Sequence, residues 1–359
     1  MWIVAASVAL LSVPAQGAGK TTHVIFVMMD GMRWQDVFRG ADPDLLNKEH
    51  GGVGNVEEIK RDFWRDTPQG RREALMPFVW GEIAKKGQIY GNRDRGSDAY
   101  VTNGFNFSYP GYNEILCGFP DPRVDSNDKK PNPNVTVLEW LNRKPAYAGK
   151  VAAFAAWDTF PSILNVGRSS LVVNAGYDPL TIPPMNPRIE LLNRLKIETN
   201  VLDEEPMDAT TFHTALEYVR LHQPKVLYLS LGESDEWAHA GRYDLYLRSS
   251  QRFDQFVKEL WETVQSMPEY RGTTTLILGV DHGRGVAPTE WRGHGQKVPD
   301  SKNVWMAFLG PDTRALGERS KVAPITQSQI AATLAALLGE DYNAAVKNAG
   351  AVVRDVLSQ

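Results

Sequence analysis

Cysteine is almost absent from this chain, which has a single thiol, Cys117, among 359 residues. An intramolecular disulfide is therefore excluded, and so is a zinc site built from several thiolates. An excess of one charge is also lacking, because 39 basic residues stand against 43 acidic ones and the net charge is -4. This balance predicts no specific nucleic-acid binding. Any bound metal must be held mainly by carboxylate, hydroxyl and imidazole groups.

The sequence also lacks the long apolar runs of a polytopic membrane protein. The first apolar run, residues 2–13, is about 12 residues long, whereas a helix needs roughly 20 to cross a bilayer. Its length and the small residues after it predict a secretory signal peptide over residues 1–18, cleaved between Ala15 and Ala18. No basic residue precedes the run, and a buried first strand is the alternative. A signal peptide implies an exported protein, periplasmic or secreted, with no transmembrane segment in the mature chain.

Short apolar runs without clean alternation predict strands that are covered on both faces. They lie at residues 23–29, 151–155, 171–174, 226–231, 274–280 and 304–309. Amphipathic stretches predict helices at residues 73–86, 209–222, 243–267 and 326–338. This alternation predicts an α/β fold with a doubly wound, mostly parallel sheet flanked by helices. Two stretches, at about 42–72 and 175–206, break the alternation and are expected to be cap-like insertions over the strand ends, with a helix at 187–199 in the second.

Acidic and histidine residues follow three of these strands and one later loop. In chain order they are Asp30, Asp235, His239, Asp281, His282 and His294. Each one alone could be a turn residue, a helix cap or a surface histidine. Together they provide three carboxylates and three imidazoles at one edge of the sheet, which suits two three-ligand metal sites with open positions for a substrate. Zinc is the expected metal, and manganese is the alternative.

The order of these residues resembles the alkaline phosphatase superfamily, and in particular its type I phosphodiesterase/nucleotide pyrophosphatase branch. The shared order is Asp, a nucleophile segment, Asp-x-x-x-His, Asp-His and a late His, and the helix at 326–338 is similar too. The resemblance covers roughly residues 22–340 outside the insertions and implies one metallohydrolase domain over residues 20–359. It implies one metal ion on Asp30, Asp281 and His282 and a second on Asp235, His239 and His294.

The resemblance also implies a Ser or Thr nucleophile that ligates a metal at a helix N-terminus. The segment NFSYPGYNEILCG, residues 106–118, places Ser108 in this role, as an additional ligand of the Asp30 metal. Pro110 in the first turn and Gly118 at the end bound a helix of about eight residues. Such a helix start favours an anion, and metal binding lowers the pKa of a hydroxyl group. Thr102 is the alternative nucleophile.

A downstream Asn contacts a phosphoryl oxygen in this branch, and Asn127 is the favoured candidate here. Asn132 and Asn134 are alternatives, because the local pattern departs from that of the family. Arg284 and Arg292 are further candidates for contact with the phosphoryl group.

These features together imply an exported two-metal hydrolase of phosphoric esters, either a phosphomonoesterase or a phosphodiesterase. It would act on a small-molecule ester through a covalent phosphoseryl intermediate at Ser108. A sulfate-ester hydrolase of the same superfamily is an alternative, but the C/S-x-P-x-R motif that yields formylglycine is absent, since Tyr112 stands where Arg is needed. The sequence is also compatible with a phosphoglycerate-mutase-like phosphotransferase and with a non-catalytic binding protein that keeps a relic site.

Overall fold

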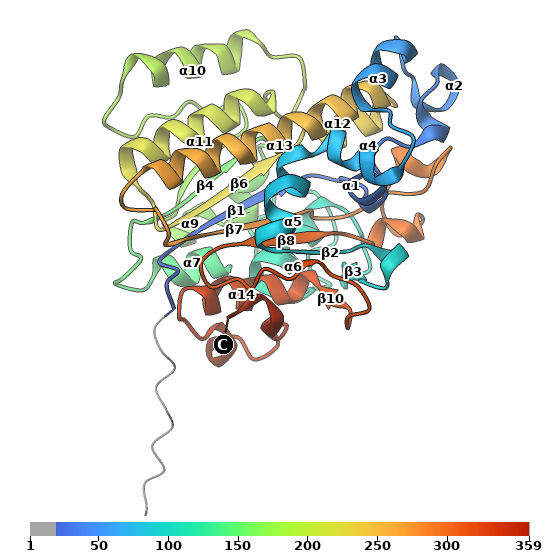
Figure 1. Ribbon diagram of the computed structural model, residues 1–359. Helices are drawn as coiled ribbons and strands as arrows, with labels where there is room; N and C mark the ends of the chain where they lie inside the picture. The colour runs from blue at the N-terminus through green and yellow to red at the C-terminus, as the bar shows by residue number, and fades with distance from the viewer. Residues whose placement is uncertain (1–18, 359) are drawn as a thin grey trace, which may run out of the picture.

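The computed structural model of the protein describes residues 19–358. The predicted signal peptide, residues 1–18, lies outside the described residues. An eight-stranded sheet forms the centre of the molecule, in the order β5-β4-β6-β1-β7-β8-β2-β9, and β10 pairs with β3 in a separate two-stranded sheet. Helices cover both faces of the large sheet (Figure 1). The predicted α/β fold with a mostly parallel sheet is therefore confirmed.

Five neighbouring strands of the large sheet are parallel, and all of them were predicted from their apolar runs. They are β1 (His23–Met29), β4 (Val151–Ala155), β5 (Val172–Ala175), β6 (Val226–Leu231) and β7 (Thr274–Gly279). The predicted strand β8 (Met306–Leu309) runs antiparallel to β7 and β2. Four short strands were not predicted, namely β2 (Gln88–Tyr90), β3 (Ala99–Tyr100), β9 (Gly317–Glu318) and β10 (Ile325–Thr326). With two or three residues each, they are too short to show a periodic pattern.

The two faces of the sheet carry different sets of helices (Figure 1). One face carries α11 (Asp208–His222) and α13 (Tyr243–Ser266), and α10 (Pro187–Glu198) packs on α11 as an outer layer. The other face carries α6 (Ser108–Cys117), α7 (Val137–Asn142) and α14 (Ile330–Leu337). The remaining α-helices are α1 (Trp34–Arg39), α2 (Lys48–Gly51), α3 (Val56–Phe63), α4 (Pro68–Leu75), α5 (Ala84–Lys86), α8 (Phe160–Ile163), α9 (Val166–Ser169), α12 (Glu233–His239) and α15 (Tyr342–Ala345). The π-helical turn is η2 (Val79–Ile83), and the 3-10 turns are η1 (Pro43–Leu45), η3 (Arg93–Arg95), η4 (Glu290–Arg292), η5 (Pro299–Lys302), η6 (Gln327–Gln329) and η7 (Arg354–Val356).

The prediction of one continuous helix over residues 73–86 is wrong. The helix α4 ends just before Pro77, and the chain continues as the π-helical turn η2 and the short helix α5. Proline has no N–H group to donate and its ring clashes with the preceding turn. The free N–H groups of Phe78 and Val79 instead donate to the carboxylate of Asp254 on α13, each at 2.8 Å. A side chain on a distant helix therefore replaces the missing backbone acceptors.

Substitution Asp254→Ala is expected to lower the free energy of unfolding by about 2–4 kcal/mol, because two buried N–H groups lose their acceptors. Urea denaturation of the purified protein measures this change. The matched variant Asp254→Asn keeps one oxygen acceptor and should lose less. Equal losses in the two variants would contradict the role given to this carboxylate.

The two predicted insertions contain helices and lie in different places (Figure 1). Residues 42–72 form η1, α2, α3 and the first turns of α4, and Arg248 on α13 forms ion pairs with Glu58 and Asp62 of this insertion. Residues 175–206 contain α10, which matches the helix predicted at 187–199. Only the second insertion contributes residues to the cavity described below. Within residues 19–358, every helix is too short or too polar to span a bilayer.

Candidate active site

Three adjacent strands, β6, β1 and β7, bring the predicted site residues together at their carboxyl ends. Asp30 directly follows β1, and its backbone N–H donates to the carbonyl of Leu231 at the end of β6. Asp281 and His282 follow β7, and Asp281 accepts the N–H of Gly31 at 3.1 Å. These bonds across neighbouring strand ends fix the spacing of the carboxylates.

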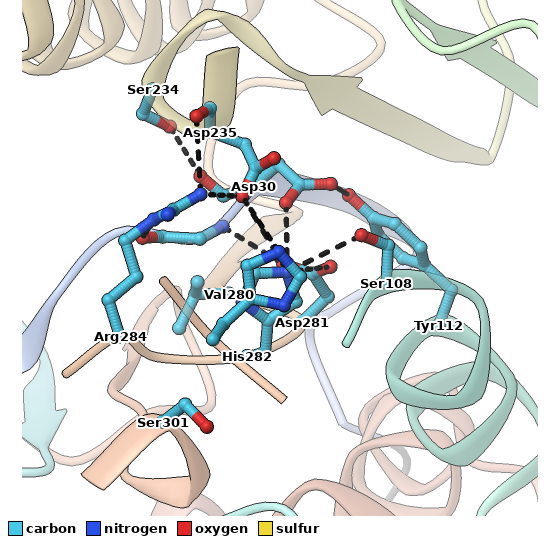
Figure 2. Close-up of polar contacts among 12 residues, drawn as sticks. Asp30, Ser108, Tyr112, Ser234, Asp235, Val280, Asp281, His282, Arg284 and Ser301 are labelled. Atoms are coloured by element: carbon cyan, nitrogen blue, oxygen red, sulfur yellow. Dashed lines mark hydrogen bonds and ion pairs between the residues drawn. The ribbon is translucent and has the colours of Figure 1, made fainter. Parts of the chain in front are cut away.

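The first cluster consists of Asp30, Asp281 and His282, all of which are buried. The Nε2 atom of His282 lies 3.3 Å from Oδ1 of Asp30 and 3.4 Å from Oδ2 of Asp281 (Figure 2). Among the described residues, neither of these two oxygens has a hydrogen-bond partner. Buried carboxylate oxygens without partners are costly, and a divalent cation would satisfy both. The residues present therefore fit a metal ion.

The pKa values of the first cluster also favour a bound metal ion. Burial, reinforced by the charge of Asp30, raises the pKa of Asp281 to about 8. Burial lowers the pKa of His282, but the carboxylates of Asp281 and Asp30 outweigh it and raise that pKa to about 9. Burial raises the pKa of Asp30, but the interactions with His282, Tyr112 and Arg284 together outweigh it and leave the pKa of Asp30 below its usual value. Protons therefore occupy the cluster without a cation, and a metal would displace them.

The second cluster consists of Asp235 and His239 on α12 and His294 in the loop after β7. The prediction that Asp235 and His239 share a helical face is confirmed, since Nε2 of His239 lies 3.1 Å from Oδ2 of Asp235. Nε2 of His294 lies 2.9 Å from Nε2 of His239 and 3.8 Å from Oδ1 of Asp235. Burial, with the charge of His282 adding to it, lowers the pKa of both His239 and His294. Both imidazoles are thus kept neutral, the form that ligates metals.

His282 lies between the two clusters. Its ring stacks on that of His294 with 3.9 Å between the centroids, and its Nε2 lies 3.8 Å from Oδ1 of Asp235. The clusters are therefore adjacent, as a two-metal site requires.

Ser108, the predicted nucleophile, is the first residue of α6, and its Oγ lies 3.4 Å from Nε2 of His282 (Figure 2). The first turn of α6 packs directly on the end of β7, because a Cβ atom at Gly111 would lie 2.4 Å from the carbonyl oxygen of Asp281. One turn after Ser108, the hydroxyl of Tyr112 donates to Oδ2 of Asp30 at 2.8 Å. The same helix thus places Ser108 and orients a carboxylate of the first cluster.

The C-terminal part of the chain holds these elements in place. Nε2 of Gln327 donates to the carbonyls of Val280 and Asp281 at 2.6 and 2.7 Å. The hydroxyl of Ser328 donates to the buried carboxylate of Glu114 on α6. Further along, the hydroxyl of Tyr342 donates to the carbonyl of Cys117 at the end of α6. The predicted start of the late helix is also found here, because Thr326 and Gln329 form a capping box.

The structure distinguishes the candidates that the sequence left open. Thr102, the alternative nucleophile, donates its hydroxyl to Glu114 at 2.7 Å and is not among the residues that line the cavity. Asn127 lines the cavity, and its Oδ1 accepts the N–H of Tyr109 in the first turn of α6 at 3.0 Å, which leaves the amide N–H groups for a ligand. The side chains of Asn132 and Asn134 are buried and form hydrogen bonds with the surrounding chain, so they are not free to contact a ligand.

Neither arginine candidate lines the cavity. Arg284 is buried and donates to the carbonyls of Gly31 and Arg292 and to Asp235. Burial lowers the pKa of Arg284 to about 9. Arg292 is exposed and donates to the carbonyl of His50. The expectation that one of them contacts a phosphoryl group is therefore not supported, because both guanidinium groups are bound to other partners.

A cavity of about 210 Å³ opens above the two clusters. Its lining combines the predicted residues with others that sequence reasoning missed. The predicted ones are Asp30, Ser108, Asn127, Asp235, His239 and His294, and the missed ones are Trp157, Glu204, Glu205, Gly232 and Glu236. Glu236 directly follows the predicted ligand Asp235, and this position in the sequence could have indicated that Glu236 lies at the site. Glu204 and Glu205 end the second insertion, whose path no local pattern reveals.

The fold and site together define an α/β protein with two adjacent metal-ligand clusters and a serine at a helix start. No protein-family model and no curated protein sequence matches the chain. Solved structures do match it. A putative sulfatase from Bacteroides thetaiotaomicron VPI-5482 is 14% identical with a TM-score of 0.60, over 94% of this chain and 75% of its own.

Two further solved structures are described as a member of the alkaline phosphatase superfamily and as an alkaline phosphatase. A protein in the alkaline phosphatase superfamily from Vibrio parahaemolyticus is 14% identical with a TM-score of 0.54, over 90% of this chain and 68% of its own. The wild-type alkaline phosphatase PafA is 10% identical with a TM-score of 0.60, over 96% of this chain and all of its own, 100%. The chain therefore has the alkaline phosphatase superfamily fold, as predicted. The phosphodiesterase branch stays a prediction.

Proposed function

We propose that the protein is an exported enzyme, a two-metal hydrolase of phosphoric esters that uses Ser108 as its nucleophile. The observation that carries this proposal is the position of Ser108. Its Oγ lies at the start of α6, 3.4 Å from Nε2 of His282, where the two clusters of metal ligands meet. Proteins of this fold include both a phosphatase and a putative sulfatase, so the fold alone does not decide the ester.

Six residues would hold the metals, with Asp30, Asp281 and His282 on one ion, Ser108 as a further ligand there, and Asp235, His239 and His294 on the other. When bound, two divalent cations, zinc before manganese given these nitrogen and oxygen donors, would neutralise negative charge on the phosphoryl group and lower the pKa of the Ser108 hydroxyl.

The residues of the chain then account for the reaction. Oγ of Ser108 passes its proton to water and forms a bond to phosphorus while the bond to the ester oxygen breaks, and the leaving alkoxide takes up a proton from water. Water then attacks phosphorus in the phosphoseryl intermediate, which releases phosphate and restores the hydroxyl. The helix start at Ser108 and the amide of Asn127 stabilise the negative charge of the phosphoryl oxygens.

Tyr112 favours a phosphoric over a sulfuric ester. In the motif that yields formylglycine, the position four residues after the modified residue is Arg, and here it is Tyr112. This side chain is buried and donates to Asp30, so the position serves the first cluster instead. An unmodified Ser108 is therefore the expected nucleophile.

The metal-loaded protein is expected to hydrolyse p-nitrophenyl phosphate or bis-p-nitrophenyl phosphate at least 100-fold faster than p-nitrophenyl sulfate. This ratio corresponds to a difference of roughly 3 kcal/mol in activation free energy. Initial rates of p-nitrophenol release measure this. Faster sulfate hydrolysis would replace the proposal with a sulfate-ester hydrolase. Phosphate transfer to an added alcohol without net hydrolysis would indicate a phosphotransferase, and no turnover of any ester would indicate a relic site.

A further inference from the structure

One side of the cavity has a chemistry that ester hydrolysis itself does not need. Beside the metal-ligand clusters, the lining includes three carboxylates and one indole, from Trp157, Glu204, Glu205 and Glu236, which we call the acidic wall. No lysine or arginine is among the lining residues in the described part of the chain. A substrate with further negative charges, such as a nucleotide, would meet repulsion here.

Glu205 is the central member of the acidic wall. Its side chain is 4% exposed, and its Oε1 has no hydrogen-bond partner within residues 19–358. The carboxyl group sits on the backbone of Gly232, where an added Cβ atom would come within 1.9 Å of Oε2. Gly232 ends the turn between β6 and α12, which carries the ligand Asp235. An unpaired acid is therefore held deep in the cavity, and a glycine leaves the space for it.

The neighbouring basic side chains form ion pairs with other carboxylates and not with Glu205. Arg252 forms an ion pair with Glu233 at 2.6 Å, and Lys129 forms one with Asp158 at 2.7 Å. Among the described residues, the groups placed to hold a metal ion are Asp30, Asp281 and His282, and Asp235, His282 and His294, and neither group includes Glu205. Burial and the nearby carboxylates of Asp208 and Glu236 raise the pKa of Glu205 well above its usual value, so the acid holds a proton when no ligand is bound. A cation that arrives with a ligand would take the place of this proton.

Trp157 adds a surface suited to an organic cation. Its indole Nε1 donates to Oε2 of Glu204 at 2.9 Å, which fixes the ring at the cavity. The face of a tryptophan ring attracts ammonium and quaternary ammonium groups. Glu236 is half-buried on the same helix as Asp235 and His239, so the acidic wall is continuous with the second cluster.

We infer that the acidic wall binds a positively charged ammonium group carried by the ester, so that the preferred substrate is an aminoalkyl or cholinyl phosphate. This inference rests on the proposed function and narrows it to a substrate class. The phosphoryl group lies at Ser108 and the clusters, and the ammonium group lies against Trp157 and Glu205.

The test compares phosphocholine with its uncharged isostere 3,3-dimethylbutyl phosphate. The wild-type enzyme should show a kcat/KM at least about tenfold higher for phosphocholine, the size expected for a desolvated cation at an aromatic and acidic site. In Glu205→Gln, which has the same shape without the charge, the ratio of the two kcat/KM values should approach one. The control Glu198→Gln, on the same insertion but exposed and outside the cavity, should keep the wild-type ratio.

A binding measurement gives a second readout that needs no turnover. Calorimetric titration of choline chloride into Ser108→Ala should show binding that is lost in the double variant with Glu205→Gln. Equal kcat/KM for both esters in the wild type, together with no choline binding, would overturn the inference while leaving the hydrolase proposal intact. Choline binding without hydrolysis of any ester would overturn the proposed function instead. Glycerophosphocholine in place of phosphocholine distinguishes a diester source of the same headgroup from a monoester.

Discussion

Ser108→Ala is expected to lose activity by a factor of at least 1000 while the protein stays folded. No other hydroxyl among the cavity-lining residues is placed beside His282, so the covalent step has no substitute nucleophile. The fold should persist, because the Ser108 hydroxyl makes one contact, of 3.4 Å, and its loss costs at most about 2 kcal/mol. Initial rates with p-nitrophenyl phosphate and a thermal melt measure the two effects.

Matched variants make this result specific. Ser108→Thr should keep part of the activity, since the hydroxyl is preserved, and phosphate trapped by acid quench should map to the peptide that contains Ser108. Thr102→Ala removes the alternative nucleophile, and we expect it to stay active because that hydroxyl is bound to Glu114. An inactive Thr102→Ala beside a fully active Ser108→Ala would transfer the role to Thr102. Full activity in both would mean that water attacks the ester directly.

The second large effect concerns the metals. The purified protein should contain close to two equivalents of divalent metal, and His239→Ala and His282→Ala should each lose about one of them. The two side chains lie in different clusters, and removing a ligand from a three-residue site leaves too few donors to hold the ion. Metal analysis by mass spectrometry gives the stoichiometry. Two ions retained in either variant would show that the ligand sets are assigned wrongly.

Chelation provides an independent measure of the same sites. Removing the ions should lower the melting temperature, because a ligand at 100 times its Kd stabilises a fold by about 2.7 kcal/mol. His50→Ala is the matched control, since this imidazole lies outside both clusters and should keep both ions. A melting temperature that chelator does not change would mean that no metal is bound at the clusters.

Much of the fold could be predicted because its central strands are buried on both faces. A run such as residues 226–231 is buried throughout and, apart from Ser230, apolar, so it predicts a strand without knowledge of its neighbours. The break at Pro77 was harder to place, because the acceptor that makes it tolerable, Asp254, comes from another helix. The two-residue strands form only because a partner is present, and their sequences carry no signal of it.

Some residues of the candidate site could also be predicted from the sequence, and others could not. Asp30, Asp235 and Asp281 stand next to predictable strand ends, so their meeting follows from the rule that parallel strands end at one edge. Glu205 could not be placed, because its position depends on how residues 175–206 return to the sheet. Arg284 and Arg292 were near enough in sequence to suggest a role, but Arg284 is bound to Asp235 and to backbone carbonyls, and Arg292 to the carbonyl of His50, outside the cavity lining.

The contacts of Gln327, Ser328 and Tyr342 also have a consequence in time. These residues follow the central strands in the chain and leave the ribosome after them, and yet they anchor both the strand end that carries Asp281 and the helix that carries Ser108. A chain that stops before Gln327 is expected to lack the hydrogen bonds that hold Ser108 and the two clusters at their observed separation. The arrangement proposed for catalysis is therefore expected only after these residues have been made.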